Sequence, residues 1–326
     1  MAALAKRVVL LGNGKPALDC LSVLLEQEPG YSDALRELVL VLVDASNTNL
    51  GASLQGYCEA KGVPYIATPN VNDENVLRQL RVLKPDLILS VNTFQILKKP
   101  FLDLAPDRVI NFHNAPLPRY AGLNACTWAI VDGRKEHGIT WHLVGEGVDT
   151  GDVLLQEVFP ISMSCTALGL IMECIRRSKI LFAENLDDIV ADTLERKPQD
   201  KTKRIFHYQH EVPCGGFVDF RWNYEQLDCF VRGLNFHPMP NPLAFPKGEF
   251  NGQAFYIDKI GPAKENSIQS PGTVVALGKE LVVAIADGAA QLLEVRDAEC
   301  KRIPIEQFVS DYGLSVGDTL TGGTHA

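Results

Sequence analysis

The chain has 326 residues, 46% of them hydrophobic, and a formal net charge of -9. This length and composition indicate a globular protein with one domain of about 200 residues and a second of about 100. The acidic balance speaks against a surface built to hold a nucleic-acid phosphate backbone. No stretch approaches about 18 uninterrupted apolar residues, and the N-terminus has no signal-peptide pattern, so we expect a cytoplasmic protein that does not contact membranes.

The first half of the chain alternates short apolar runs with helical patterns. Apolar strands that alternate with helices predict a parallel sheet with helices on both faces, an α/β fold of Rossmann-like type. The predicted strands are residues 7–11, 38–43, 87–91 and 109–113, and the predicted helices begin at Pro16 and cover 75–83.

The pattern changes in the second half. Apolar spacing predicts a long helix over 165–190, and a charged, proline-broken run over 196–204 follows it. After a helical stretch at 222–234, short strands between Gly, Pro and Asp turns predict a small antiparallel β-barrel of OB-like type. These strands are 254–257, 272–275, 281–285 and 291–295. We therefore expect a catalytic domain at 1–200, a linker at 201–218, a barrel domain at 219–320 and a tail at 321–326.

The segment Asn111-Phe112-His113 ends the fourth predicted strand, where ligands of such sheets bind. Residues i and i+2 of a strand point to the same side about 6.5 to 7 Å apart, so Asn111 and His113 address one small group while Phe112 faces the core. An amine that attacks a formyl carbon creates a negative oxygen, to which an amide and a protonated imidazole are suitable donors. Asp149, on a glycine-flanked loop, can orient His113, hold it charged or accept a proton through a water.

Two further motifs accompany these residues, Leu117-Pro118-Arg119-Tyr120 before Gly122 and Val148-Asp149-Thr150-Gly151-Asp152. Together the motifs resemble the folate-dependent formyltransferase family over almost the whole chain. The resemblance implies 10-formyltetrahydrofolate as cofactor, tetrahydrofolate as product, and Asn111, His113 and Asp149 as catalytic residues. It implies cofactor contacts from Phe94, Gln95, Ile96, Leu97, His142, Glu146, Gly147 and Val148. We expect contacts to the acceptor from Asn114, Pro116, Arg119, Tyr120, Gly122, Leu123 and Asn124.

The second half resembles the C-terminal barrel of the two-domain branch of this family, which includes the methionyl-tRNA formyltransferases. Residues 45–53 nevertheless contain no Lys or Arg, and Ala121 stands where that branch has an arginine, so tRNA is a poor fit as acceptor. Leu123-Asn124-Ala125 and Asn241-Pro242-Leu243 are most similar to formyltransferase domains of nonribosomal peptide and polyketide assembly lines. We expect an N-formyltransferase of natural-product biosynthesis that acts on a small-molecule or carrier-bound amine, without nucleic acid. Fusion to or association with biosynthetic modules would suit the linker-like tail.

Other acceptors and functions stay open at this point. The same chemistry would serve initiator methionyl-tRNA or a nucleotide-linked amino sugar. A folate-binding module without turnover and a formyltetrahydrofolate hydrolase are further alternatives.

Three other patterns have simpler interpretations. Gly12-x-Gly14 is half of a dinucleotide fingerprint, but the third glycine is missing and a plain turn is favoured. His207, His210 and Cys214 have the residue types of a zinc site, yet their surroundings favour an ordered linker, and we expect no metal. The basic run 201–204 reads as a solvated linker that could touch an anionic substrate.

Overall fold

The structure, a computed structural model, describes residues 5–26, 36–46, 53–264, 267–278 and 280–322. The chain divides into two compact units. The first comprises the chain up to Gly122, Gly138–Phe159 and Met172–Phe206, and the second comprises Leu123–His137, Pro160–Ile171 and the chain from His207 onward. Most of the uncharged loop predicted at 45–53 and most of the predicted tail, namely 47–52 and 323–326, lie outside the described residues.

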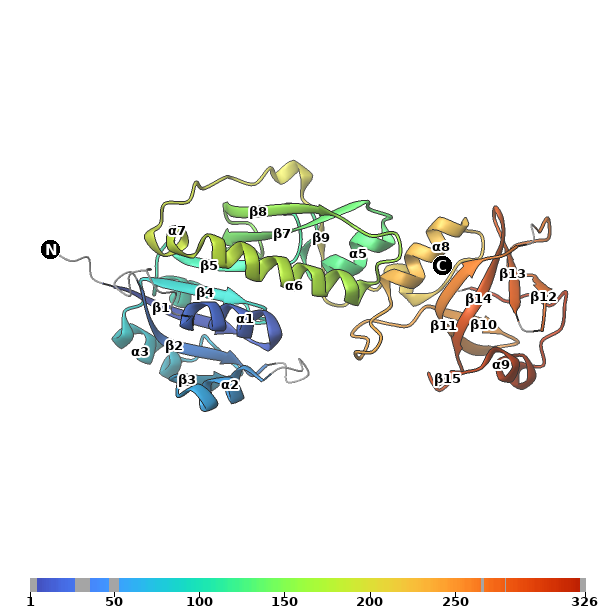
Figure 1. The fold of residues 1–326 in the computed structure, drawn as a ribbon, viewed down its shortest axis with the longest axis horizontal. Helices are drawn as coiled ribbons and strands as arrows, with labels where there is room; N and C mark the ends of the chain where they lie inside the picture. The colour runs from blue at the N-terminus through green and yellow to red at the C-terminus, as the bar shows by residue number, and fades with distance from the viewer. Residues whose placement is uncertain (1–4, 27–35, 47–52, 265–266, 279, 323–326) are drawn as a thin grey trace. The chain divides into compact units, whose positions relative to one another are not determined.

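The first unit is built on a seven-stranded sheet in the order β3-β2-β1-β4-β5-β7-β8 (Figure 1). Its strands are β1 (Lys6–Gly12), β2 (Arg36–Asp44), β3 (Tyr65–Thr68), β4 (Leu87–Val91), β5 (Val109–His113), β7 (Glu136–Leu143) and β8 (Val153–Pro160). The strands from β3 to β5 are parallel, whereas β7 is antiparallel to β5. The predicted Rossmann-like α/β unit is confirmed, but its sheet is mixed and the prediction of a parallel sheet holds for five strands only.

Helices cover both faces of this sheet, as predicted. Val9 and Leu11 of β1 pack in one cluster with Leu77 of a covering helix, while Val8 and Leu10 are fully buried on the opposite face. The helices of the first unit are α1 (Gly14–Leu25), α2 (Leu54–Lys61), α3 (Glu74–Leu83), α4 (Lys99–Leu102), most of α6 (Ala167–Glu184) and α7 (Leu186–Ala191).

Gly12 at the end of β1 permits close packing of two strands, and Gly14 begins α1. A Cβ at Gly12 would lie 2.1 Å from the carbonyl oxygen of Val91, so only glycine fits between these strands. The side chain of Asn13 caps α1 by accepting a hydrogen bond from the Gly14 N–H at 2.7 Å. These contacts support the interpretation of the Gly-x-Gly pattern as a turn.

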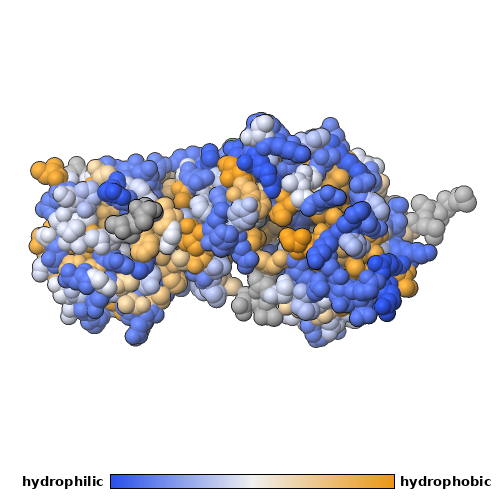
Figure 2. Space-filling model, turned by 180° about the vertical axis from the view of Figure 1, so that it is seen from behind, coloured by the Kyte–Doolittle hydropathy of each residue, from blue (hydrophilic) through white to orange (hydrophobic). Residues whose placement is uncertain are grey.

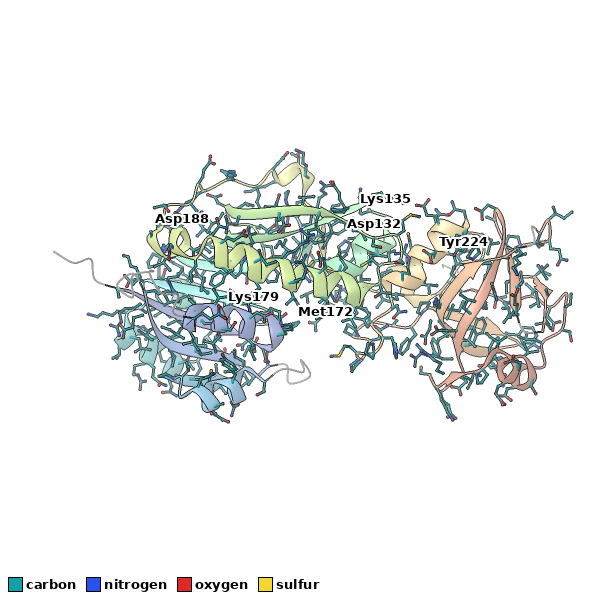
Figure 3. All side chains as sticks on the ribbon, in the orientation of Figure 1. Asp132, Lys135, Met172, Lys179, Asp188 and Tyr224 are labelled. Carbon is teal, nitrogen blue, oxygen red and sulfur yellow. The ribbon has the colours of Figure 1, made fainter. Side chains whose placement is uncertain are left out.

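Helix α6 packs over the strands that carry the candidate site. The ring of Trp141 on β7 is fully buried, 5.5 Å from the ring of Phe112 on β5 and 5.0 Å from that of Phe182 on α6. Met172 and Lys179 mark the course of α6 in Figure 3. Phe112 therefore faces the core, which leaves the alternate positions of β5 for the site.

The predicted helix over 165–190 is two helices. Asn185 has φ -118 and ψ 12, which interrupts the helical path between α6 and α7. Among the described residues no helix is long and apolar enough to cross a membrane. Figure 2 shows hydrophobic residues interspersed among hydrophilic ones over the face that it draws.

The second unit contains a six-stranded antiparallel sheet in the order β10-β11-β14-β13-β12, with β15 paired to β14. Its strands are β10 (Lys247–Phe250), β11 (Gln253–Pro262), β12 (Val274–Ala276), β13 (Leu281–Ile285), β14 (Gly288–Arg296) and β15 (Arg302–Ile303), and its helices are α5 (Ala125–Val131), α8 (Tyr224–Gly233) and α9 (Ile305–Tyr312). Thr321 pairs with Glu249 of β10, and Thr319 pairs with Thr273 next to β12. The end of the chain thus bridges the two edges of the sheet, as expected for a small barrel.

Candidate functional site

Three side chains form a row across β4, β5 and β7. In the sheet register Ser90 stands opposite Asn111, which in turn stands opposite His142. The Ser90 hydroxyl donates to Asn111 Oδ1 at 2.9 Å, and Asn111 Nδ2 donates to the Phe112 carbonyl at 3.1 Å. Nδ2 also lies 3.2 Å from His142 Nε2, while His142 Nδ1 lies 2.8 Å from the Leu143 carbonyl. His142 thus contacts Asn111 through Nε2 and the main chain of β7 through Nδ1.

His113 closes β5 and is 7% exposed. Its Nε2 lies 2.8 Å from the carbonyl oxygen of Tyr120, and its Nδ1 lies 3.6 Å from Asp149 Oδ2. Both ring nitrogens therefore face acceptors, an arrangement that favours the doubly protonated imidazolium. The Asp149 carboxylate stabilises this charge from just beyond direct hydrogen-bond distance.

Asp149 lies on the loop between β7 and β8 with its backbone in the left-handed region, at φ +51. Its Oδ2 accepts a hydrogen bond from the Gly122 N–H at 2.8 Å, and its Oδ1 lies 3.5 Å from His142 Nε2. Burial disfavours the charged carboxylate, but the charge of His113 and the polar contacts of His142 and Gly122 outweigh it and hold the pKa of Asp149 well below its usual range. The three residues predicted as catalytic thus meet, together with His142, in one buried network.

The segment predicted to bind the cofactor, residues 94–97, follows β4 and is partly exposed. Phe94 and Ile96 are 42% and 63% exposed. The side chain of Gln95 points away from solvent: its Oε1 accepts from the Val71 N–H at 2.7 Å, and its Nε2 donates to Asp44 Oδ1 at 2.6 Å. Gln95 therefore anchors the segment through its side chain.

Two more side chains hold the main chain of this segment. Asp44 Oδ2 accepts from the Phe94 N–H, and the Asn72 amide donates to the Ile96 carbonyl, each at 2.9 Å. The N–H groups of Ile96 and Leu97 and the carbonyl of Leu97 have no hydrogen-bond partner within the described part of the chain. A rigid segment with free donors and acceptors suits a flat polar ligand.

The other predicted cofactor residues lie on the loop after β7. Glu146, Gly147 and Val148 are exposed, Val148 by 41%. Val144 at the start of this loop and Leu97 pack against the same hydrophobic cluster, so the loop begins near the segment 94–97.

The residues expected to contact the acceptor divide into two sets. Tyr120 and Gly122 reach the site through their main chain, since the Tyr120 carbonyl faces His113 and the Gly122 N–H binds Asp149. Asn114 and Pro116 are half-buried and Arg119 is exposed on the same unit, whereas Leu123 and Asn124 belong to the second unit. Their contacts to an acceptor stay a prediction.

Sequence reasoning missed several residues that support the site. Ser90, Asp44 and Asn72 act on residues more than 20 positions away, and no local motif marks them. The interpretation of the basic run 201–204 as a solvated linker is wrong for Arg204, which donates to the carbonyls of Val148 and Asp149 beside the site.

The histidine considered as a zinc ligand has a packing role. His207 Nδ1 lies 3.1 Å from Glu211 Oε2, and its ring stacks on that of Trp128 at a centroid distance of 4.0 Å.

Comparison with known proteins agrees with this geometry. A family model for formyl transferase matches residues 43–177, and one for the formyl transferase C-terminal domain matches residues 213–313. GDP-perosamine N-formyltransferase of Brucella melitensis is 28% identical over 255 residues, 78% of this chain and 93% of that protein. Methionyl-tRNA formyltransferase of Geotalea daltonii is 27% identical over 321 residues, 96% of this chain and 98% of that protein. The crystal structure of an N-formyltransferase from Helicobacter canadensis with folinic acid and dTDP-3-aminofucose has a TM-score of 0.68 at 19% identity, covering 92% of this chain and 100% of its own, and shares the fold.

Proposed function

Because the chain belongs to the folate-dependent formyltransferase family, we propose that it transfers the formyl group of 10-formyltetrahydrofolate to the primary amine of a small-molecule acceptor. The observation that carries this proposal is the buried network of Asn111, His113, His142 and Asp149 at the carboxyl edge of the sheet. An amide donor, an imidazole and a carboxylate in contact are the groups that formyl transfer to an amine requires.

The segment 94–97 supports a folate donor. Exposed Phe94 and Ile96 offer apolar contacts to a flat heterocycle, and the free main-chain groups of Leu97 match the polar edge of such a ring. Val148 adds a further exposed apolar side chain from the loop that carries Asp149. Bound there, 10-formyltetrahydrofolate would supply the formyl carbon that the acceptor amine attacks.

Each residue of the network has a separate task. Asn111 Nδ2 donates a hydrogen bond to the negative charge that develops on the formyl oxygen, and the positive charge of the His113 imidazolium stabilises it electrostatically. For this, one N–H of Asn111 turns away from His142, whose Nε2 lies 3.2 Å from Asn111 Nδ2. Asp149 keeps His113 charged. The proton that the attacking amine loses would pass through a water to the departing nitrogen of the donor.

The acceptor class rests on the relatives as well as on the sequence. A nucleotide-linked amino sugar is our first candidate, because the Brucella relative that matches over 93% of its length is named for such a substrate. Methionyl-tRNA is the second, because the Geotalea protein matches 96% of this chain. A carrier-bound amine in natural-product biosynthesis stays a prediction from residues 123–125 and 241–243.

The test is a formyl-transfer assay with 10-formyltetrahydrofolate and a panel of acceptors. The panel holds a nucleotide-linked amino sugar, charged initiator tRNA, a carrier-bound aminoacyl group and buffer alone, and release of tetrahydrofolate is followed together with the formylated product. We expect the amino sugar to be formylated. Formylation of tRNA as the fastest reaction would instead assign the second candidate.

Two controls separate formyl transfer from its alternatives. Release of formate in buffer alone at the full rate would identify a hydrolase. Asn111→Ala and His113→Ala should each reduce single-turnover formyl transfer at least about 100-fold, because the first removes a hydrogen-bond donor to the charged oxygen and the second removes the positive charge beside it. Folate binding with unchanged, negligible turnover in all variants and in the unmodified protein would identify a binding module.

A further inference from the structure

A segment that lies about 50 residues after Asp149 in the sequence contacts both the loop of Asp149 and the loop of Tyr120. We name residues 197–206 the strap. At its start Lys197 pairs with Val153 through two main-chain hydrogen bonds, and near its end the Ile205 carbonyl accepts from the Ala121 N–H at 2.9 Å. The strap therefore joins the loop of Asp149 to the loop whose Tyr120 carbonyl faces His113.

Two side chains of the strap bind the main chain at Asp149 itself. Gln199 Nε2 donates to the Asp149 carbonyl at 3.0 Å and to the Gly151 carbonyl at 2.7 Å. Arg204 donates through Nη1 to the Asp149 carbonyl at 3.3 Å and through Nη2 to the Val148 carbonyl at 2.7 Å. The carbonyls of Val148, Asp149 and Gly151 are thus held by one side-chain amide and one guanidinium group.

These contacts matter because Asp149 is held in a conformation that it does not favour alone. A non-glycine residue at φ +51 lies in a sparsely populated region, and the surrounding contacts must stabilise it. Gly151 adds a tight constraint, since a Cβ there would lie 1.9 Å from the Leu143 carbonyl oxygen. Any relaxation of this turn moves the Asp149 carboxylate, which lies 3.6 Å from His113 and 3.5 Å from His142.

We propose that Gln199 and Arg204 are positioning residues for formyl transfer: they hold the carbonyls of the Asp149 turn and so keep its carboxylate between the two imidazoles. The inference rests on the proposed function, because it gives these residues an effect on rate through Asp149. Neither side chain touches the formyl group or the amine. A shift of the carboxylate by about 1 Å is enough to lower the rate by up to about 100-fold.

The first experiment replaces each donor by an apolar chain of similar length in the full-length protein. Gln199→Met and Arg204→Met should lower kcat about 10-fold to 100-fold, while the dissociation constant for tetrahydrofolate and the melting temperature stay close to those of the unmodified protein. Gln209→Met and Arg196→Met are matched controls at exposed or surface-paired positions outside the strap, and both should retain full activity. An unchanged kcat in Gln199→Met, or equal losses in the controls, would overturn the inference.

A double-mutant cycle shows whether the strap acts through Asp149. In an Asp149→Asn background, adding Gln199→Met should lower the single-turnover rate by less than about twofold, since the carboxylate that it positions is gone. A full multiplicative loss in this background would mean that Gln199 has a general structural role, and would contradict the inference. If Asp149→Asn alone retained full activity, the catalytic assignment under the proposed function would fail, and the strap inference with it. A loss in Asp149→Asn without any loss in Gln199→Met would remove the strap inference alone.

Discussion

Asn111 and Asp149 belong to one network, yet the chain holds them by different means. Asn111 stands in a strand, and its side chain faces His142 because the register of β5 and β7 places the two residues opposite each other. Asp149 stands on a loop, and Gln199 and Arg204 hold its main-chain carbonyl from 50 and 55 residues further along the chain. The position of a strand residue thus follows from the sheet, whereas that of the loop residue depends on a distant segment.

The largest effect on catalysis is expected from Asn111, a network residue that stands in a strand. Asn111→Asp keeps the shape of the side chain but puts a carboxylate oxygen where Nδ2 donates to the Phe112 carbonyl and faces His142. We expect kcat/KM for formyl transfer to fall about 100-fold to 1,000-fold, because a donor to the developing charge becomes a repelling acceptor. Steady-state kinetics with the preferred acceptor measure the effect. Activity within about threefold of the unmodified protein would show that Asn111 is not the donor.

Much of the fold could be predicted because its signals are local. The apolar runs at 38–43 and 87–91 lie within β2 and β4. Of the short strands predicted in the second half, 254–257, 281–285 and 291–295 lie within β11, β13 and β14, and 272–275 overlaps β12 in part. The antiparallel direction of β7 could not be predicted, because it depends on where the chain passes after β5 and no local pattern reports that path. The break at Asn185 was missed because one interrupted turn leaves the apolar spacing nearly intact.

The same contrast applies to the site. Asn111 and His113 could be singled out because residues i and i+2 of a strand point to the same face of the sheet, where both can act on one group. The support from Ser90, Asn72 and Gln199 could not, because each side chain binds a residue that only the folded chain brings near. The assignment of catalytic roles stays a prediction until the variants are measured.

The segment 94–97 offers a second example of a loop that is held by a side chain distant in sequence. Asn72 donates to the Ile96 carbonyl and accepts from the Lys98 N–H at 2.9 Å, so it holds the segment 94–97 as the strap holds Asp149. Asn72→Leu should raise the dissociation constant for tetrahydrofolate about tenfold, since two hydrogen bonds that order the segment are lost, with kcat at saturating donor nearly unchanged. Binding is measured by calorimetry, with the exposed Asn75→Ala as control. A loss confined to kcat would contradict a role of this segment in donor binding.

A smaller effect on kcat is expected from Ser90, because the register of β5 already positions most of the Asn111 side chain. Ser90→Ala removes one hydrogen bond to Asn111 Oδ1 and leaves the register of β4 and β5 unchanged. The expected decrease in kcat is about threefold to tenfold, equivalent to one modest hydrogen bond. Ser178→Ala, at a buried serine of α6 with no hydrogen bond to the network, is the matched control and should have normal kinetics. A loss as large as that of Asn111→Asp would mean that the sheet register alone does not position the amide.

The smallest expected effect is a difference in the pH dependence of stability between variants of Asp149, which is charged, and variants of Asn111, which is not. The pKa of Asp149 is lowered in the folded state by His113, His142 and Gly122 against the opposing effect of burial, so its ionised form stabilises the fold above the ordinary carboxyl pKa. This contribution is lost as the pH falls below about 4, where an unfolded Asp becomes protonated. The difference in denaturant midpoint between the unmodified protein and Asp149→Asn should therefore shrink between about pH 5 and pH 3. Asn111 carries no titratable group, so the corresponding difference for Asn111→Ala should stay constant over the same range. A constant difference for Asp149→Asn would show that its carboxylate gains nothing from the two imidazoles in the folded protein.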